Sequence, residues 1–391
     1  MNTAVYLNQT KQVILRRNHP WIFPKAIAKS TGTLITGGLL DIYSQENEFI
    51  GKGIYNEYSL YRVRVIVKAH EQHLFQNLQE VIQKRIQDAL LLRQALNLPN
   101  ATTNAFRVFN SEADGLSGLT IDRFGEHLVI ASSAYWVEAN KELIFTVLKS
   151  LFPANNLIWQ SQQKPLKQDG WTDLQNEEVQ FEKTEVKEAS VIFQVEFGKT
   201  QKTGLFLDQR ENHERIAALA EGKRVLDLYS YTGGFALHAA KAKAAKVVAV
   251  DSSATAITQA KENALLNNLN NIEFIEGDAR DYLKMASEFD IVILDPPKLV
   301  PSRKHLQNAK NYYRFLHREL FKLMQSGSLL MTCNCSSALS QDEFANLVSN
   351  QATAVGKEAR ILGVFGPAAC HPVLMSFPEG NYLTAILLAL I

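Results

Sequence analysis

Five short apolar runs alternate with stretches of helical pattern in the second half of the chain, and this alternation restricts the fold more than any other feature. The runs lie at residues 225–228, 247–251, 272–275, 291–295 and 329–332, and a helical stretch such as 254–267 separates two of them. A run that is apolar throughout indicates a strand covered by helices on both faces. We therefore predict a doubly wound, mostly parallel α/β sheet from about residue 191, with an antiparallel pair at 361–365 and 382–390 on its edge.

The first 70 residues have a different pattern, with short predicted strands and an excess of positive charge. The strands are expected at 13–15, 39–43 and 61–67, separated by Gly, Asn and Pro. Nine Lys or Arg stand against four Asp or Glu, which gives +5 here and −4 for the rest of a chain whose net charge is +1. A basic module on a mildly acidic body favours a polyanion partner, although charge alone is better explained as an ordinary solvated surface.

Two groups of side chains in this segment carry further expectations. Alternate residues of a strand share a face, so Arg62, Arg64 and Lys68 are predicted to lie together. Four aromatic residues stand among the charges and would either stack on bases or fill the small core; we expect at least half of them in the core. They are Trp21, Phe23, Tyr58 and Tyr61.

The region between these two patterns is predicted to contain both helices and strands. Apolar residues recur at three and four over 74–90, which predicts a helix. A hairpin is expected at 106–109 and 119–122, turning at 123–126 into 127–132, and a second helix at 137–151. The chain is therefore divided into a β-rich domain at 1–72, a linker helix with a small α+β domain at 73–190, and the α/β domain at 191–391.

Composition excludes several classes of protein. With 46% hydrophobic and 21% charged residues the chain is an ordinary globular sequence. Three cysteines, Cys333, Cys335 and Cys370, cannot form a fully paired disulfide framework and fit a reducing compartment. Cys-x-Cys with a distant Cys370-His371 is a poor match to a tetrahedral zinc site, so no metal is expected. No signal peptide and no membrane-spanning run is present, so we expect a soluble cytoplasmic protein.

Four acidic residues come at the ends of successive apolar runs, where ligands bind in sheets of this kind. They are Asp227, Asp251, Asp278 and Asp295. The pair Gly233-Gly234 allows the backbone to approach a ligand closely, but the loop lacks the Gly-x-Gly-x-x-Gly pattern of a dinucleotide site. The acids suit a methionyl amino group, a ribose and an adenine amino group, which favours S-adenosylmethionine over NAD. Each acid alone is better explained as a helix cap or a turn residue, and only the series is a stronger signal.

The chain carries three motifs that resemble those of class I S-adenosylmethionine-dependent ribosomal RNA methyltransferases. They are Asp-Leu-Tyr-Ser-Tyr-Thr-Gly-Gly-Phe (227–235), Asp-Pro-Pro-Lys (295–298) and Lys-Thr-Gly-Leu-Phe-Leu-Asp-Gln-Arg (202–210). The nearest group is RlmI-like and forms 5-methylcytidine in 23S ribosomal RNA. The resemblance covers the whole chain and implies an N-terminal PUA domain, a small α+β middle domain and a Rossmann-like methyltransferase domain. The segment His-Pro-Val-Leu-Met-Ser-Phe-Pro-Glu-Gly (371–380) resembles the C-terminal signature.

The resemblance also implies a set of site residues and S-adenosyl-L-methionine as the cofactor. The implied cofactor site consists of Asp227, Tyr229, Gly233, Gly234, Phe235, Asp251, Ser252, Asp278, Ala279, Asp295, Gln209 and Arg210. The implied catalytic residues are Cys335 and Asp295.

The expected chemistry centres on Cys335. Cytosine C5 is a poor nucleophile, and attack of a thiolate at C6 makes C5 able to accept a methyl group. The family's nucleophile directly precedes a serine, which matches Cys335-Ser336, and Cys333 is expected to be a small core residue. The site should lower the pKa of the thiol or supply a base for its proton. Asp295 would contact the exocyclic amine or a protonated N3, and the base that removes the C5 proton stays unassigned.

We expect a cytosine-C5 methyltransferase that acts on large-subunit ribosomal RNA. One alternative is the same fold methylating a base nitrogen without a nucleophilic cysteine. A second alternative is a non-catalytic RNA-binding or ribosome-assembly protein, and a small-molecule methyltransferase gains no support from the N-terminal charge. The expected partner is ribosomal RNA, no membrane partner is expected, and a homodimer is the default assembly.

Overall fold

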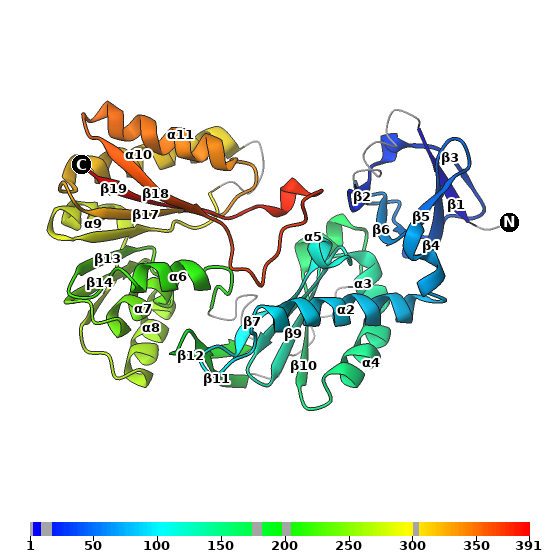
Figure 1. Ribbon diagram of the computed structural model, residues 1–391, viewed down its shortest axis with the longest axis horizontal. Coiled ribbons are helices and arrows are strands. Elements are labelled where there is room, and N and C mark those ends of the chain that lie inside the picture. Colours follow the sequence, from blue (N-terminus) through cyan, green and yellow to red (C-terminus); the bar gives the residue numbers. More distant parts are fainter. Residues whose placement is uncertain (1–2, 9–17, 174–181, 198–204, 300–304) are drawn as a thin grey trace.

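The computed structural model describes residues 3–8, 18–173, 182–197, 205–299 and 305–391 (Figure 1). Its first sheet has six strands in the order β2-β6-β5-β4-β1-β3. They are β1 (Ala4–Leu7), β2 (Trp21–Ile22), β3 (Ile27–Thr31), β4 (Leu39–Tyr43), β5 (Phe49–Tyr55) and β6 (Val63–Lys68). The predicted strands at 39–43 and 61–67 are thus confirmed, whereas 13–15 lies outside the described residues.

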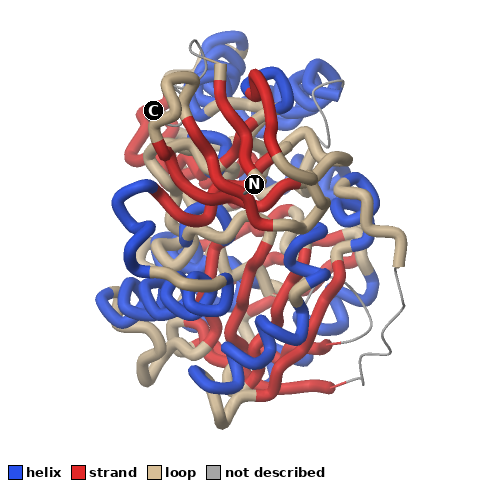
Figure 2. The backbone as a smooth tube through the Cα atoms, turned by 90° about the vertical axis from the view of Figure 1, so that its right-hand side faces the viewer, coloured by secondary structure: helices blue, strands red, loops and turns tan. Residues whose placement is uncertain are grey.

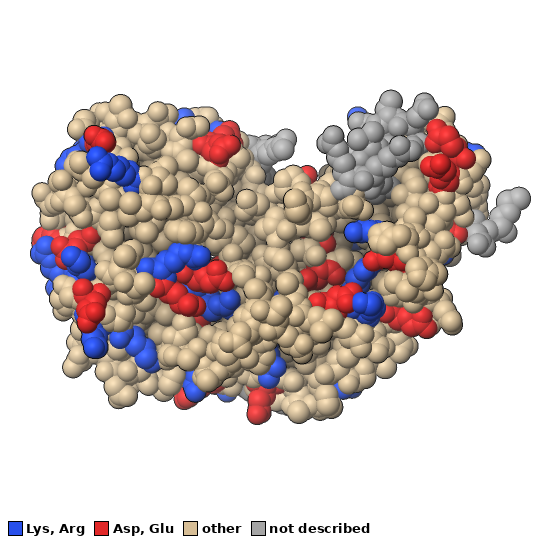
Figure 3. All heavy atoms as spheres, in the orientation of Figure 1, with Lys and Arg blue, Asp and Glu red and all other residues tan. Residues whose placement is uncertain are grey.

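The three residues predicted to share a face do not form an exposed basic surface, because Arg62 precedes β6 and Arg64 is buried. Arg64 is 4% exposed, and its Nη2 donates to Asp169 Oδ1 at 2.8 Å. An unpaired guanidinium would be costly at this depth, so the ion pair fixes Arg64 against the middle region of the chain. On the face that Figure 3 shows, described Lys and Arg are interspersed with Asp and Glu rather than gathered over the N-terminal sheet.

The expectation that half of the aromatic residues fill the N-terminal core is also wrong. The buried core cluster contains none of them and consists of Val5, Leu7, Ile22, Ala26, Leu40, Ile42 and Val63. Trp21 instead stacks on Tyr61, with ring centroids 3.7 Å apart, and meets Phe377 edge-on at 4.5 Å. Phe23 lies edge-on to Tyr61 at 6.1 Å, and Tyr58 is 61% exposed. The aromatic cluster therefore joins the N-terminal sheet to the C-terminal part of the chain.

The middle region pairs a long helix with a four-stranded sheet in the order β10-β9-β8-β7. Its elements are α2 (Leu78–Ala95), β7 (Ala105–Asn110), β8 (Leu119–Phe124), β9 (His127–Ser132), α3 (Tyr135–Ala139), α4 (Lys141–Leu151), β10 (Asn156–Ser161) and α5 (Gln163–Gln168). The first helix and the hairpin are confirmed. The predicted helix at 137–151 is divided at Asn140, whose φ of −112° and ψ of 24° leave the helical region.

A hairpin of β11 (Glu182–Glu188) and β12 (Val191–Phe197) connects this region to the last sheet. The predicted domain boundary at 190 falls in its turn, so the two paired strands lie on opposite sides of that boundary. The divisions at 72 and 190 stay predictions.

The last sheet has seven strands in the order β15-β14-β13-β16-β17-β19-β18. They are β13 (Arg224–Leu228), β14 (Lys246–Asp251), β15 (Ile272–Glu276), β16 (Ile291–Leu294), β17 (Leu329–Asn334), β18 (Ala359–Phe365) and β19 (Thr384–Leu390). The five apolar runs form the parallel part, and β19 pairs antiparallel with both β17 and β18, as predicted. After β15 the chain returns to the other side of β13, so the strand order reverses between β13 and β16.

Helices cover both faces of this sheet, which explains why its central strands are almost entirely apolar, whereas the edge strand β15 carries Glu273 and Glu276. They are α6 (Arg210–Ala217), α7 (Gly234–Lys241), α8 (Ala254–Leu266), α9 (Ala279–Tyr282), α10 (Leu306–Leu323) and α11 (Gln341–Ala354). Helices α10 and α11 lie on one face and α6 to α8 on the other (Figure 1). In the view from the N-terminal side, helices lie around the outside of the strands (Figure 2). Ligands of such sheets bind at the carboxyl ends of the strands, next to the reversal of strand order.

Candidate functional site

Asp227 is the penultimate residue of β13, beside this reversal, and is fully buried. Its Oδ2 accepts a hydrogen bond from the Ala236 N–H at 3.0 Å, whereas Oδ1 has no partner. Burial, reinforced by the nearby charge of Asp295, raises the pKa of Asp227 to about 8. A buried carboxyl with one unsatisfied oxygen is suited to a cationic ligand, because a positive charge would stabilise the ionised form.

The loop between β13 and α7 turns sharply. Tyr229, Tyr231 and Gly233 have φ values of 66°, 50° and 89°, all in the left-handed region. The hydroxyl oxygens of Tyr229 and Tyr312 lie 2.8 Å apart in a hydrogen bond.

The two residues after Gly233 pack inward. A Cβ on Gly234 would lie 2.6 Å from the imidazole of His213, so packing against α6 already requires a glycine here, and its predicted approach to a ligand stays a prediction. Phe235 is 4% exposed and also meets the His213 ring, edge-on at 4.5 Å. The Phe235 side chain thus belongs to the core.

The next two strand ends carry carboxylates with local hydrogen-bond partners. Asp251 Oδ2 accepts from the Tyr231 N–H at 2.9 Å, and Oδ1 accepts from the Ser253 N–H at 2.8 Å. Ser252 beside it is exposed.

Asp278 is the N-cap of α9, and hydrogen bonds from the side chain and backbone N–H of Arg280 lower its pKa. Ala279 is buried. Asp278 therefore satisfies the capping explanation that the sequence left open, and its carboxylate already has a cationic partner.

Asp295, directly after β16, joins residues from three parts of the chain. Gln209 Nε2 donates to its Oδ2 at 2.9 Å, and the Cys335 thiol contacts its Oδ1 at 3.8 Å. Both Asp295 and Cys335 are half-buried. Burial, with a contribution from Asp208, raises the pKa of Asp295 to about 7.

The two cysteines predicted as competing nucleophiles have different surroundings. Cys333 lies inside β17, is fully buried and pairs with Ala385, as expected for a core residue. Cys335 follows the strand and is half-buried. Burial and the neighbouring Asp295 raise the pKa of Cys335 well above the usual range, so the site does not lower it. The second option, an adjacent base, is the one that the geometry supports.

Two residues of the 202–210 motif have contacts that the sequence did not predict. Arg210 Nη1 lies 3.5 Å from Cys370 Sγ, and its ion-pair partners are Glu211 and Glu214, so its described contacts lead away from the strand-end acids. Asp208, which sequence reasoning did not single out, accepts a hydrogen bond from the Tyr382 hydroxyl at 2.7 Å and raises the pKa of both Asp295 and Cys335. The signal for Asp208 was its place in the 202–210 motif, of which residues 202–204 lie outside the described residues.

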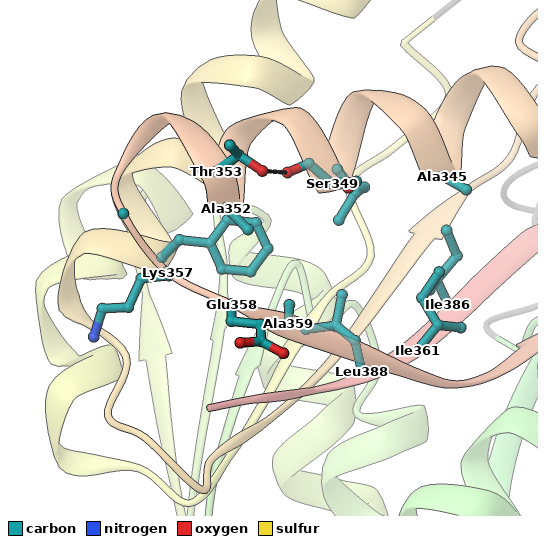
Figure 4. A pocket seen from close by; sticks show the side chains of 13 residues that line it. Ala345, Ser349, Ala352, Thr353, Lys357, Glu358, Ala359, Ile361, Ile386 and Leu388 are labelled. Carbon is teal, nitrogen blue, oxygen red and sulfur yellow. Dashed lines mark hydrogen bonds between the residues drawn. The ribbon is translucent and has the colours of Figure 1, made fainter.

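A cavity of about 450 Å³ lies elsewhere, between α11 and the edge strands β18 and β19 (Figure 4). Its walls are mainly apolar, and Lys357 and Glu358 stand at one end. None of the predicted site residues lines it. Among the described residues, no helix is both long and apolar enough to cross a membrane.

Comparison with known proteins agrees with this arrangement. A family model described as S-adenosylmethionine-dependent methyltransferase matches residues 153–361, and one described as PUA-like domain matches residues 5–68. The chain is 33% identical over 400 residues to ribosomal RNA large subunit methyltransferase I of Aeromonas salmonicida, covering 99% of both proteins. The protein of that name from Escherichia coli is 30% identical over 392 residues, with 98% of both covered.

Two solved structures share the fold over 99% of both chains at 19% sequence identity. One is a Streptococcus mutans protein described as a candidate SAM-dependent methyltransferase, with a TM-score of 0.82. The other, SMU.776, is described as a candidate methyltransferase complexed with SAH and has a TM-score of 0.83.

Proposed function

This chain belongs to the family of S-adenosylmethionine-dependent ribosomal RNA large subunit methyltransferase I, and we propose that it methylates C5 of a cytosine in large-subunit ribosomal RNA. The observation that carries the proposal is the Cys335 thiol 3.8 Å from the Asp295 carboxyl, at the carboxyl ends of adjacent strands. A ribosomal substrate further suggests a cytoplasmic location. A homodimer stays a prediction.

The residues at the strand ends fit S-adenosylmethionine. Asp227 offers a buried oxygen without a partner, which suits the cationic amino group of the methionyl part. Asp251, half-buried at the end of β14, suits the ribose hydroxyls. The bound cofactor supplies an electrophilic methyl group. We propose that Asp227, Asp251 and the loop 229–235 hold it, and that Phe235 contributes only backbone.

In the proposed mechanism Asp295 carries a proton for Cys335. Because the pKa of Asp295 is about 7, its carboxyl both accepts and returns a proton near neutral pH. The thiol proton passes to Asp295 as the sulfur bonds to C6, and Asp295 then protonates N3, which neutralises the charge that develops on the ring. Gln209 holds the second oxygen of Asp295 and so orients the first one towards the thiol.

The last step requires a base on the sulfur side of the ring. After methylation C5 carries one extra proton, and its removal lets the C5–C6 double bond re-form as the C6–S bond breaks. We propose Asp208 as this base, because its charge already acts on Cys335 and Asp295 and the Tyr382 hydroxyl fixes one of its oxygens. The proton of N3 returns through Asp295 to the departing sulfur.

The matched pair Cys335→Ala and Cys333→Ala tests the proposal. Each variant is incubated with labelled S-adenosylmethionine and unmodified ribosomal RNA, and the nucleosides are analysed by mass. We expect 5-methylcytidine from the parent protein and from Cys333→Ala, and none from Cys335→Ala. Retained methylation in Cys335→Ala with a base methylated on nitrogen would replace the proposal by the nitrogen methyltransferase. No methylation of RNA or ribosomal particles by any form would favour a non-catalytic RNA-binding protein.

A further inference from the structure

Three potential metal ligands converge behind the loop that connects β13 to α7. Glu188 ends β11, His213 lies on α6 and His238 on α7, and all three are buried. Their ligand atoms all lie within 4.8 Å of one another. His213 Nδ1 is 2.7 Å from Glu188 Oε1, and His238 Nε2 is 3.8 Å from the same oxygen.

The cluster contains more hydrogen-bond acceptor atoms than N–H groups that could donate to them. The His238 ring lies between two backbone carbonyls, with Nδ1 2.8 Å from Gly234 O and Nε2 3.1 Å from Glu188 O. A neutral imidazole has only one N–H, so one ring nitrogen must face a carbonyl with its lone pair. Glu188 Oε2 is buried and has no partner at all. Several lone pairs therefore point at one another in a dry interior, which a cation would relieve.

We propose that Glu188, His213 and His238 form a binding site for a divalent transition-metal ion, with Zn²⁺ as the best fit. Two imidazoles and a carboxylate are the three protein ligands of one common class of zinc site, which leaves a fourth position for another donor; the unpartnered Glu188 Oε2 is available for it. With bonds of about 2.1 Å, two donors of a tetrahedral ion lie roughly 3.4 Å apart, and the separations of 2.7 and 3.8 Å fall on either side of that value. His238 Nε2 would bind the ion while Nδ1–H donates to Gly234 O, the usual second contact of a ligating histidine.

The burial of the three side chains supports the same assignment. Glu188 is 0% exposed, and His213 and His238 are each 3% exposed. An ionised carboxylate at this depth has no solvent to stabilise its charge. A bound cation would remove that cost.

The location implies a structural role for the ion. The site would tie together the β11–β12 hairpin, helix α6 and helix α7, three segments that come from separate parts of the sequence. Helix α6 begins directly after Gln209, whose side chain donates a hydrogen bond to Asp295. His213 packs closely against Gly234 at the start of α7. A metal here would therefore fix the cofactor loop and Gln209 relative to each other without touching substrate.

Metal content of the full-length protein tests the proposal directly. The protein is purified without a metal-affinity tag, passed over a desalting column and measured by elemental mass spectrometry, and its melting temperature is recorded with and without added Zn²⁺. The test variant is Glu188→Gln, which keeps the shape and one hydrogen-bond acceptor. The control is His317→Gln, which changes another buried histidine of the same domain whose contacts are Tyr313 O and Thr332 Oγ1.

We expect about one zinc per chain in the parent protein and in His317→Gln, and a loss of at least about ten-fold in zinc retention in Glu188→Gln. Added Zn²⁺ should raise the melting temperature of the metal-stripped parent and not that of Glu188→Gln. If the parent retains no zinc and its melting temperature is unchanged by Zn²⁺ or by Co²⁺, the proposal is wrong, and the cluster is held by an added proton instead. Both readouts are independent of methyl transfer, so they do not depend on the proposed reaction.

Discussion

Replacing Asp227 by Asn should stabilise the protein while it weakens cofactor binding, and the stabilisation should depend on pH. The carboxyl has a pKa of about 8 in the folded protein, raised by burial and by Asp295, against a reference of 3.8. Between these two values the folded state holds a proton that the unfolded chain has lost. Stability therefore falls as pH rises from about 4 to about 8.

The size of the effect follows from the same two pKa values. At pH 7, which is about 3 units above the reference pKa of 3.8, the raised pKa costs the folded protein at most about 4 kcal/mol, at roughly 1.4 kcal/mol per unit. An Asn amide would retain the bond to the Ala236 N–H but would bury an NH₂ group without a partner, at about 1–3 kcal/mol. The expected net gain for Asp227→Asn is therefore about 1–3 kcal/mol at pH 7 and larger at pH 8, with no gain at pH 4.

Urea unfolding of the parent and of Asp227→Asn, near the two ends of the titration at about pH 4.5 and about pH 8, measures the difference in stability. Isothermal titration calorimetry with S-adenosylmethionine measures cofactor binding. Losing a hydrogen bond to a charged amino group should weaken binding by about ten-fold or more. If Asp227→Asn is less stable than the parent at pH 8, or if its advantage is the same at both pH values, the assigned titration is wrong. Unchanged cofactor affinity would contradict the assigned contact.

Two further substitutions test the arrangement of the domains and the last catalytic step. Arg64→Met should lower the free energy of unfolding by about 3–5 kcal/mol, because it leaves the charge of Asp169 buried without its ion-pair partner. The control Lys84→Met breaks an exposed ion pair with Asp88 and should lower the free energy of unfolding by less than about 0.5 kcal/mol. Equal effects of the two substitutions in thermal unfolding would contradict the buried pair. Asp208→Asn should leave formation of the RNA–protein adduct intact and slow its release, so denaturing gels should show more covalent complex with ordinary RNA; a variant with neither adduct nor product would assign Asp208 an earlier role.

The α/β sheet was predictable because its signal is local. Strands covered by helices on both faces must be apolar at every position, so their runs are visible without knowledge of the rest of the fold. The edge pair β18 and β19 and the antiparallel hairpin β7–β8 were equally visible. The ends of the strands then located Asp227, Asp251 and Asp295, because carboxyl ends of parallel strands meet at one edge.

The failures come from contacts between residues far apart in the sequence. Arg64 looked like a surface residue because its partner Asp169 lies in another part of the chain. At least half of the four N-terminal aromatic residues were expected in the core of a small domain, but Trp21 stacks on Tyr61 and packs against Phe377 near the other end of the chain. The packing of Gly234 against His213 was likewise not visible in the sequence.

The site was incomplete for the same reason. The spacing of the cysteines was the only metal-binding pattern considered in the sequence. Glu188, His213 and His238 do not follow a known metal-binding motif, because a hairpin and two helices bring them together in space. The high pKa of Cys335 depends on burial, which no motif reveals. The motif indicated Cys335 as the nucleophile, and the proposed transfer of its proton to Asp295 required the structure.

A trapped adduct tests the covalent mechanism most directly. RNA in which 5-fluorocytidine replaces cytidine accepts sulfur at C6 and a methyl group at C5, but the fluorine cannot leave as a proton, so the C6–S bond persists. We predict a complex between this RNA and the parent protein that survives denaturation, requires S-adenosylmethionine and maps to Cys335. A parent protein that methylates ordinary RNA but forms no such complex, or a complex that maps to Cys333, would contradict the account.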